Sequence, residues 1–373
     1  MRIEVIQEEI KFQALKEEWN ALLSQSLTNE ITLTWQWLYT WWQVFKDPTR
    51  KLLILTVRDD QGTLIGIAPL HVKTTRPYCF LPPIQQLLFL ASGEEEADEV
   101  CSDYLNFILY PGQEEAILTS ILDFLTVHLA QEWDEILLHN MRADAPASLQ
   151  LQALLARRGI QCQQISHTPC SYITLPDNWD LFLQQSSSDL RSNIRRNRKA
   201  LAQAGQISFM MAHDEATLQQ GLQTLIDLHQ RRWTEKGKPG VFLSEKFLAF
   251  HKRLLPLALN NQWLKLHVLS LDHTPIAAIY NFKYNNKIYF YQSGTNTHLK
   301  KKFLERSLLD LSCTASVLKK RSPKGRSNTT FSPEALYING GGQKPLATST
   351  HGESPRERCG YVLSTSSVSS SSL

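Results

Sequence analysis

The sequence lacks the features that define several common classes of protein. Its six cysteines are scattered and include no C-x-x-C pair, which argues against zinc and disulfide frameworks and favours reduced thiols. No stretch approaches the ~20 apolar residues of a membrane-spanning helix, and the N-terminus MRIEVIQEEIKF has no apolar signal core. A Walker loop, zinc-ligand spacing and a Ser-His-Asp order are also missing. We therefore expect a cytoplasmic protein without a metal.

The composition is that of a soluble globular protein with room for two domains. The chain has 373 residues, of which 42% are hydrophobic and 20% charged. Its net charge of +3 is too small to indicate a nucleic-acid partner by itself. We predict an α/β fold with an N-terminal domain over 1–167 and a second domain over 168–298.

The most regular stretch is WLKLHVLSLDHTPIAAIYNFKYNNKIYFYQSG, residues 263–294. Its apolar residues largely alternate with polar ones, and the pairs Asp272-His273 and Asn285-Asn286 suit tight turns, so we predict three consecutive antiparallel strands. Periodicity alone favours an ordinary antiparallel meander that carries no functional site. The stretch ends in Gln292-Ser293-Gly294, where small residues permit a close backbone approach to a ligand.

The N-terminal part alternates predicted strands and helices. We expect a strand over 2–6, helices over 11–23 and 35–45, and a strand pair over 51–57 and 63–72. Strands over 85–90, 104–109 and 135–139 and helices over 113–130 and 146–157 follow. Four tryptophans within 35–42 predict a helix face that packs on a sheet. We interpret the acidic residues 94–99 as a solvated loop.

A basic helix is predicted over 187–205, SSDLRSNIRRNRKALAQAG. Five cations stand against one acid there, and four of them, Arg191, Arg195, Arg198 and Lys199, share one helix face, with Arg196 beside them. Such a helix is either a solvent-exposed face or a site for the phosphates of a ligand.

Several of these stretches resemble one enzyme family. Pro275 to Ala278, Tyr280, Phe282, Tyr284 and Tyr289 to Gly294 are similar to the second half of GNAT-type acyltransferases of the FemAB and CelD-like group. The phrases TWQWLYTWW, LIGIAPL and CSDYLNFIL resemble the first half of the CelD-like proteins, and the basic helix resembles an R-x-x-I-R-R-x-x-R stretch of the group. The resemblance covers roughly 10–298 and implies two tandem GNAT-like halves, mixed sheets flanked by helices.

The resemblance also implies a function and a set of site residues. It implies transfer of an acyl group from acetyl-CoA or another acyl-CoA to an unknown amine or hydroxyl acceptor, in cell-envelope or polysaccharide metabolism. Tyr291, Gln292, Ser293 and Gly294 would line the donor cleft. The cations Arg195, Arg196 and Arg198 would hold its phosphates. Tyr280 and Tyr289 are candidates for the base by location only, so the catalytic residues stay unknown.

Two alternatives remain open at this point. One is aminoacyl transfer from charged tRNA, as in the FemAB group, with the basic helix gripping RNA. The other is a non-catalytic scaffold that has decayed from an enzyme.

The family pattern stops soon after Gly294. From about residue 299 the chain is rich in Ser, Thr, Gly and Pro and loses apolar periodicity, so we predict a disordered tail over 299–373. Reading across the codon boundaries from Asn328 to Gly340 permits Tyr-Asp-Phe-Leu-x-Gly-x-x-x-Tyr-Lys-Trp, the pattern that the group shows after this point. We therefore predict a frameshift at Lys300–Phe303, which truncates the second half.

Overall fold

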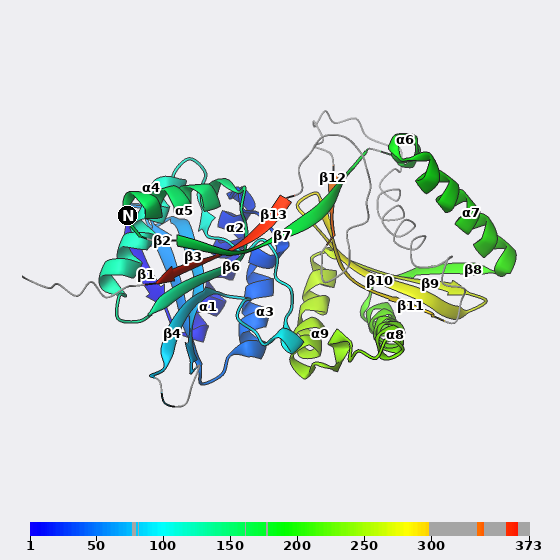
Figure 1. Cartoon of the computed structure of the whole chain (residues 1–373), viewed down its shortest axis with the longest axis horizontal. Coiled ribbons are helices and arrows are strands. Elements are labelled where there is room, and N and C mark those ends of the chain that lie inside the picture. The colour runs from blue at the N-terminus through cyan, green and yellow to red at the C-terminus, as the bar shows by residue number, and fades with distance from the viewer. Residues whose placement is uncertain are drawn as a thin grey trace, which may run out of the picture. The chain divides into compact units, whose positions relative to one another are not determined.

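The structure is a computed structural model that describes residues 1–76, 80, 82–160, 162–176, 178–297, 334–338 and 356–364. It divides into two compact units (Figure 1). Unit 1 contains Met1–Cys170 and the described part of Lys344–Leu373, and unit 2 contains the described part of Ser171–Gln343. None of the described helices is long and apolar enough to cross a membrane.

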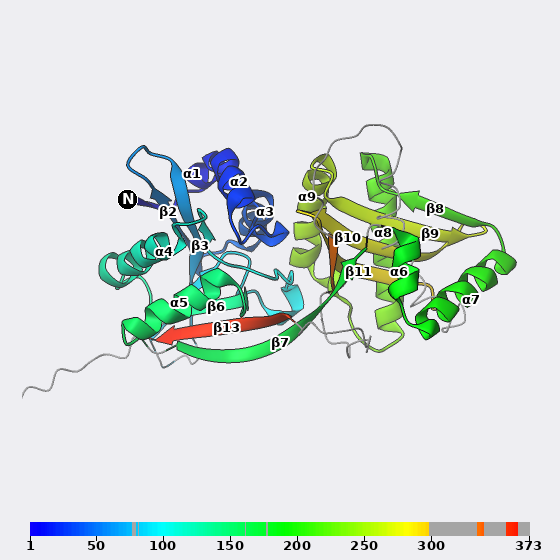
Figure 2. The same ribbon diagram turned by 90° about the horizontal axis from the view of Figure 1, so that it is seen from above.

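Unit 1 is a mixed sheet with helices on its faces. Its strands are β1 (Arg2–Ile6), β2 (Arg50–Arg58), β3 (Leu64–Thr75), β4 (Ile84–Phe89), β5 (Ile108–Leu109), β6 (Glu135–Arg142), the first part of β7 (Cys162–Leu175) and β13 (Arg356–Ser364). The order is β1-β2-β3-β4-β6-β13-β7, with β5 paired to β3. Figure 2 shows β13 beside β6 and β7. All these pairs are antiparallel except β4 with β6, which run parallel over Gln86–Leu88 and Glu135–Leu137.

The helices of unit 1 follow the predicted apolar pattern. They are α1 (Glu9–Ala14), α2 (Lys16–Gln25), α3 (Trp35–Phe45), α4 (Glu114–Asp123), the π-helical turn Phe124–His128 and α5 (Pro146–Arg157), with short 3₁₀ turns at Ile31–Leu33 and Glu96–Asp98. The single helix predicted over 11–23 is in fact two helices, which meet at Leu15. The tryptophans of α3 are buried, as predicted for a helix packed on a sheet. Thr34 caps this helix by accepting a hydrogen bond from the Trp37 N–H.

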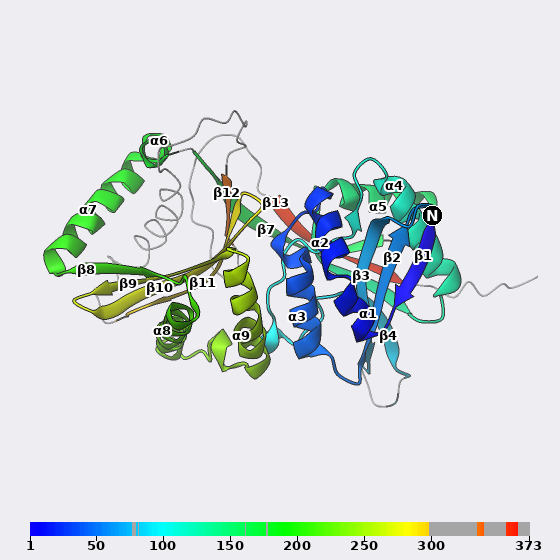
Figure 3. The same cartoon turned by 180° about the vertical axis from the view of Figure 1, so that it is seen from behind.

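Unit 2 has one sheet with helices on both faces. Its strands are β8 (Ile207–Met211), β9 (Leu264–Leu271), β10 (Thr274–Tyr284), β11 (Lys287–Thr295), β12 (Glu334–Ile338) and the end of β7, in the order β7-β12-β11-β10-β9-β8. Its helices are α6 (Trp179–Gln185), α7 (Ser188–Ala204), α8 (Glu215–Thr234) and α9 (Glu245–Asn260), with a 3₁₀ turn at Val241–Leu243. Figures 1 and 3 show α8 and α9 on one face of β8–β11 and α7 on the other. Leu201 of α7 packs against Leu269 and Ile276.

The three predicted strands of this stretch are β9, β10 and β11. Asp272 and His273 join β9 to β10 with φ of 46° and 64°, and Asn285 and Asn286 join β10 to β11 with φ of 44° and 56°. Two successive positive φ angles define the turn whose twist matches antiparallel strands, and Asn and Asp tolerate them best. The predicted turns are therefore confirmed, with Leu271 paired to Thr274 and Tyr284 to Lys287.

The C-terminal segment contributes two described strands. β12 lies parallel to β11, and β13 lies between β6 and β7. Both segments lie within the tail over 299–373; the remainder of that tail lies outside the described residues, so its disorder stays a prediction. The predicted frameshift position, Lys300–Phe303, lies outside the described residues.

Candidate functional site

The most distinctive backbone feature of unit 2 is a bulge in β11. Tyr280 of β10 pairs with Gln292 and Asn281 pairs with Phe290, so Tyr291 is an additional residue on β11. Within the described residues, the last pair between the parallel strands β11 and β12 is Phe290 with Ile338, directly before the bulge. β11 nevertheless continues to Thr295 along β10. A bulge of this kind redirects side chains and ends a pairing.

Beyond the bulge, alternate backbone groups of β11 point away from β10. The Asn296 N–H donates to the Ile276 carbonyl over 2.8 Å. Because hydrogen-bonded and non-hydrogen-bonded pairs alternate in an antiparallel ladder, Gly294 also faces β10, whereas the N–H groups of Ser293 and Thr295 face the opposite edge. In the described part of the chain, no strand pairs with that edge beyond Phe290. Within the described residues, no strand therefore pairs with the N–H groups of Ser293 and Thr295 on this edge.

A chain of three polar groups fixes the bulge residue to helix α9. The Tyr291 hydroxyl lies 3.0 Å from Nε2 of His251, and the Tyr280 hydroxyl lies 3.2 Å from Nδ1 of the same ring. A neutral imidazole has one N–H and one acceptor nitrogen, so it can satisfy both hydroxyls at once. Burial lowers the pKa of His251 to about 3 and raises the pKa of Tyr280. His251 is therefore neutral at physiological pH.

Three tyrosines of β10 and β11 differ in how accessible they would be to a substrate as a catalytic base. Tyr280 is 1% exposed and its hydroxyl lies against His251, so it is enclosed between the sheet and α9. Tyr289, the other candidate, is 8% exposed. Tyr291 is more exposed than either and lies at the bulge. The sequence did not single out His251; its only signal is a position among Phe247, Phe250 and the two tyrosines of the strands, which becomes visible in three dimensions.

Gly294 lies in close contact with helix α8. A Cβ atom at Gly294 would lie 2.7 Å from the backbone nitrogen of His229, 2.7 Å from Cβ of Leu228 and 3.0 Å from the carbonyl oxygen of Leu225. All three residues belong to α8. The backbone at Gly294 thus lies against α8, and its close approach to a ligand stays a prediction.

The cations of the predicted phosphate site are on α7. Arg195, Arg196 and Arg198 are exposed, and Arg196 donates to the side-chain oxygen of Asn193. Arg191 instead donates to the carbonyl oxygens of Leu183, Gln184 and Ser186, at the C-terminus of α6, and so has a structural role. Among the described residues, no contact joins the three exposed arginines to Tyr291, Gln292, Ser293 or Gly294.

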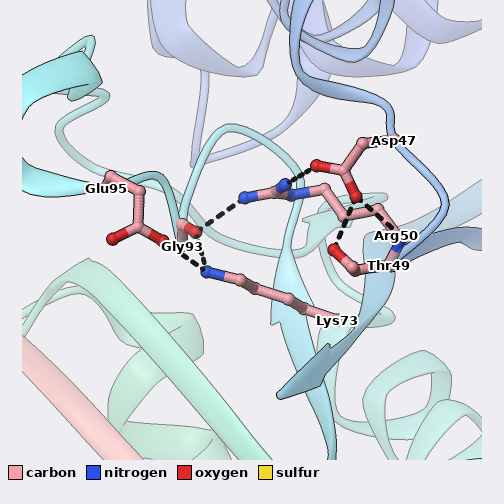
Figure 4. Close-up of polar contacts among 6 residues, drawn as sticks. All are labelled: Asp47, Thr49, Arg50, Lys73, Gly93 and Glu95. Carbon is pink, nitrogen blue, oxygen red and sulfur yellow. Dashed lines mark hydrogen bonds and ion pairs between the residues drawn. The ribbon is translucent and has the colours of Figure 1, made fainter. Parts of the chain in front are cut away.

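In unit 1, side chains of the protein form hydrogen bonds with the backbone that follows strand β4, the position that corresponds to the end of β11. Its parallel pair ends at Leu88, and the chain then turns through Ala91 and Gly93, both at positive φ. The carbonyl oxygen of Gly93 accepts hydrogen bonds from Arg50 (2.9 Å) and Lys73 (2.8 Å), as Figure 4 shows. Arg50 also pairs with Asp47, and Lys73 lies 3.6 Å from Glu95. The loop after β4 is therefore held to β2 and β3.

The acidic loop that follows is only partly a solvated loop. Glu94 accepts a 2.6 Å hydrogen bond from the Trp41 indole, and burial raises the pKa of Glu94 to about 7. The prediction of a solvated loop is wrong for this residue, although Glu95 and Glu96 are exposed. A search of the described residues finds no cluster of His, Cys, Asp and Glu able to hold a metal ion.

Comparisons with known proteins agree with this architecture. Residues 188–310 match the family model of an acetyltransferase (GNAT) domain. The crystal structure of FemX superimposes with a TM-score of 0.58 at 12% identity, covering 94% of this chain and 91% of that chain. A conserved protein of unknown function from Bacteroides thetaiotaomicron VPI-5482 gives a TM-score of 0.53 at 9% identity, covering 97% and 100% of the two chains. At such identities the likeness concerns the fold alone. The sequence matches no curated protein.

The predicted α/β class with mixed sheets flanked by helices is thus confirmed. The match over residues 188–310 also confirms the resemblance to GNAT-type acyltransferases.

Proposed function

From the GNAT domain at residues 188–310, we propose that unit 2 transfers an acyl group from acetyl-CoA or another activated donor to an amine or hydroxyl. The observation that supports this proposal is the edge of β11 beyond the bulge. There the N–H groups of Ser293 and Thr295 face away from β10, and the described part of β12 ends before them.

The proposed chemistry uses this edge as a binding site for the donor carbonyl. The acceptor nitrogen or oxygen attacks the thioester carbon, and the carbonyl oxygen becomes an oxyanion in the tetrahedral intermediate. Preorganised backbone N–H groups stabilise such a charge without reorganisation. The intermediate then collapses, the C–S bond breaks, and the leaving thiolate takes up the proton that the acceptor loses, so that the donor departs as its thiol. Binding of the acceptor and the donor along one strand would hold the reacting atoms close together, which lowers the entropic part of the barrier.

The remaining predicted site residues take roles around this edge. Tyr291, Gln292, Ser293 and Gly294 form the strand segment on which the donor lies, and Gly294 acts by letting α8 pack closely behind it. Arg195, Arg196 and Arg198 would bind the donor phosphates. Their exposure on α7 leaves them accessible to an anion.

The second candidate is aminoacyl transfer from charged tRNA, as the resemblance to the FemAB group implies. Two observations favour it: the fold is similar to that of FemX over 94% of this chain, and the arginines of α7 are exposed, as phosphate contacts of RNA require. The two candidates share the acyl-transfer site and differ only in the leaving group.

Calorimetric titration with acetyl-CoA and with a charged tRNA would separate the candidates. Micromolar binding of acetyl-CoA supports the first. Binding of tRNA whose affinity falls steeply with salt supports the second, because counterion release accompanies each phosphate contact. Absence of binding to both, in the frame-corrected chain as well, would leave the decayed scaffold as the remaining interpretation.

We also propose that the chain as written is impaired by the frameshift predicted at Lys300–Phe303. In the GNAT group, the donor pyrophosphate lies on the loop and helix that follow the strand ending here at Thr295, and the family pattern is lost shortly after it. The test is the DNA sequence around codons 300 to 303: an uninterrupted frame confirmed in independent reads would refute this proposal.

A further inference from the structure

One buried polar side chain of unit 2 is left without a partner beside the proposed site. Asn281 of β10 is 0% exposed. Neither Oδ1 nor Nδ2 has a hydrogen-bond partner among the described residues. Turning the amide over, so that its oxygen and nitrogen exchange places, would therefore not give either atom a partner. Buried polar groups are almost always hydrogen-bonded, so each exception calls for an explanation.

Asn281 lies at the end of the parallel pairing. Its partners across the ladder are Lys265 on β9 and Phe290 on β11, and Phe290 is the last residue of β11 that pairs with β12. The bulge residue Tyr291 follows immediately. The unpaired amide is thus opposite the residue that precedes Tyr291–Gly294, the segment on which the donor is proposed to lie.

The amide also faces the same side of the sheet as two residues of that segment. Tyr280 points toward α9, where it contacts His251. Side chains alternate along a strand, so Asn281 points to the opposite face, together with Ile279 and Ala277. Paired residues share a face, and Ile279 and Ala277 pair with Ser293 and Thr295. Asn281, Ser293 and Thr295 therefore form a polar row on the α7 face of β10 and β11.

An apolar side chain would be the simpler solution for folding alone. Replacing an unpaired buried amide by an apolar group of similar shape removes a desolvation cost and is neutral or stabilising. The neighbours on this face include Ile279 and Phe290, which would accept such a group. A polar residue that costs stability in the free protein is explained if it acquires partners when a ligand binds.

We propose that Asn281 is a specificity-determining residue that hydrogen-bonds the donor. A carboxamide donates through Nδ2 and accepts through Oδ1, so its complement carries a carbonyl and an N–H close together. Amide and aminoacyl groups have this chemistry. The inference rests on the proposed acyl transfer, and both candidate donors fit it: the pantetheine arm of acyl-CoA contains amides, and an aminoacyl ester carries an amine beside its carbonyl.

The test compares Asn281→Leu and Asn281→Asp with the wild-type full chain. The probes are acetyl-CoA and a hydrolysis-resistant aminoacyl-adenosine amide, titrated by calorimetry, and thermal unfolding is followed without ligand. Asn281→Leu should raise the unfolding midpoint or leave it unchanged, while weakening the bound probe about tenfold or more. Asn281→Asp keeps the shape but loses the N–H donors, so it should weaken binding as well. Leu269→Met, on the same face of β9, is the matched control and should bind normally.

The outcomes separate this inference from the proposed function. Equal binding of a probe by wild type and by both Asn281 variants overturns the inference and leaves acyl transfer intact. The probe that loses affinity identifies the donor. If wild type binds neither probe, the titrations are repeated with the frame-corrected chain, and absence of binding there means that the proposed function fails and the inference with it. A midpoint clearly lowered by Asn281→Leu means that the amide is structural, which overturns the inference by itself.

Discussion

Replacing Gly294 by alanine tests whether this glycine exists for helix packing or for ligand approach. The added Cβ would lie within 3.0 Å of three atoms of α8, two of which belong to the backbone, at His229 and Leu225. Backbone atoms cannot rotate away as the end of a side chain can. The strand and α8 must therefore separate by a few tenths of an ångström to accept the methyl group.

The expected cost follows from this geometry. Overpacking of a closely packed core typically costs about 1–3 kcal/mol, and contact with two backbone atoms favours the upper half of that range. For a unit of this size, about 1 kcal/mol corresponds to roughly 2–4 °C in the unfolding midpoint. Gly294→Ala should therefore lower the midpoint by roughly 4–12 °C in thermal unfolding followed by circular dichroism.

A second glycine, on α8 itself, provides a control. Gly221 of α8 meets only the ends of flexible side chains, Leu266 and Met210, at 3.0 and 3.3 Å. Alanine there also gains up to about 1 kcal/mol of helix propensity. Gly221→Ala should consequently change stability little. A Gly294→Ala protein as stable as wild type, but deficient in donor binding, would refute the packing argument and restore the ligand-approach interpretation.

Four other predictions follow from the site and its surroundings. Arg195→Ala with Arg196→Ala should weaken donor affinity by about 1–3 kcal/mol through lost charge-assisted bonds; calorimetry showing unchanged affinity would return α7 to a solvent-exposed face. Burial lowers the pKa of His251 to about 3, so the unfolded state binds a proton below pH 6.5 that the folded state excludes. The stability due to this group is present above pH 6.5 and is lost on acidification toward pH 3. His251→Phe should therefore reduce the slope of the unfolding free energy against pH in this range by about one proton. Urea unfolding at several pH values measures that slope, and an unchanged slope would contradict the prediction. Burial raises the pKa of Glu94 to about 7, so its contribution to stability depends on pH in the opposite direction and is lost as pH rises through 7. Glu94→Gln should therefore be more stable than wild type at pH 8, and equal stability there would contradict the raised pKa. Correcting the frame at Lys300–Phe303 should increase both solubility and acetyl-CoA binding, whereas full binding by the uncorrected chain would show that the tail supplies a functional site.

Local signals in the sequence were sufficient for the strands of unit 2. Asp272-His273 and Asn285-Asn286 are adjacent residues that tolerate positive φ, so the turns and the register between β9, β10 and β11 follow from neighbouring residues. The burial of the tryptophans of α3 was also predicted correctly, because a helix that is apolar on nearly all sides must be enclosed by the rest of its unit.

The parts of the site that escaped prediction depend on contacts between distant segments. The partner of Glu94 is Trp41, and the partner of Tyr291 is His251. Gly294 is explained by α8, which precedes it by more than sixty residues in the chain. No period or motif within one segment carries these pairings. The unpaired amide of Asn281 is harder still to predict, since an alternating strand pattern gives no sign of whether a buried polar residue has a partner.

The contrast between the two units explains why unit 2 is assigned the chemistry. In the described part of the chain, each unit has a parallel strand pair, whose last paired residues are Leu88 on β4 and Phe290 on β11. After Leu88 the chain turns, and Arg50 and Lys73 occupy the carbonyl of Gly93, so the protein already satisfies the backbone at that point. After Phe290 the chain remains a strand, with a bulge that redirects Tyr291 toward His251 and leaves alternate N–H groups facing outward. A site for a carbonyl oxygen needs donors that the fold has positioned but not used, and among the described residues only β11 combines that backbone with an unpaired buried amide beside it.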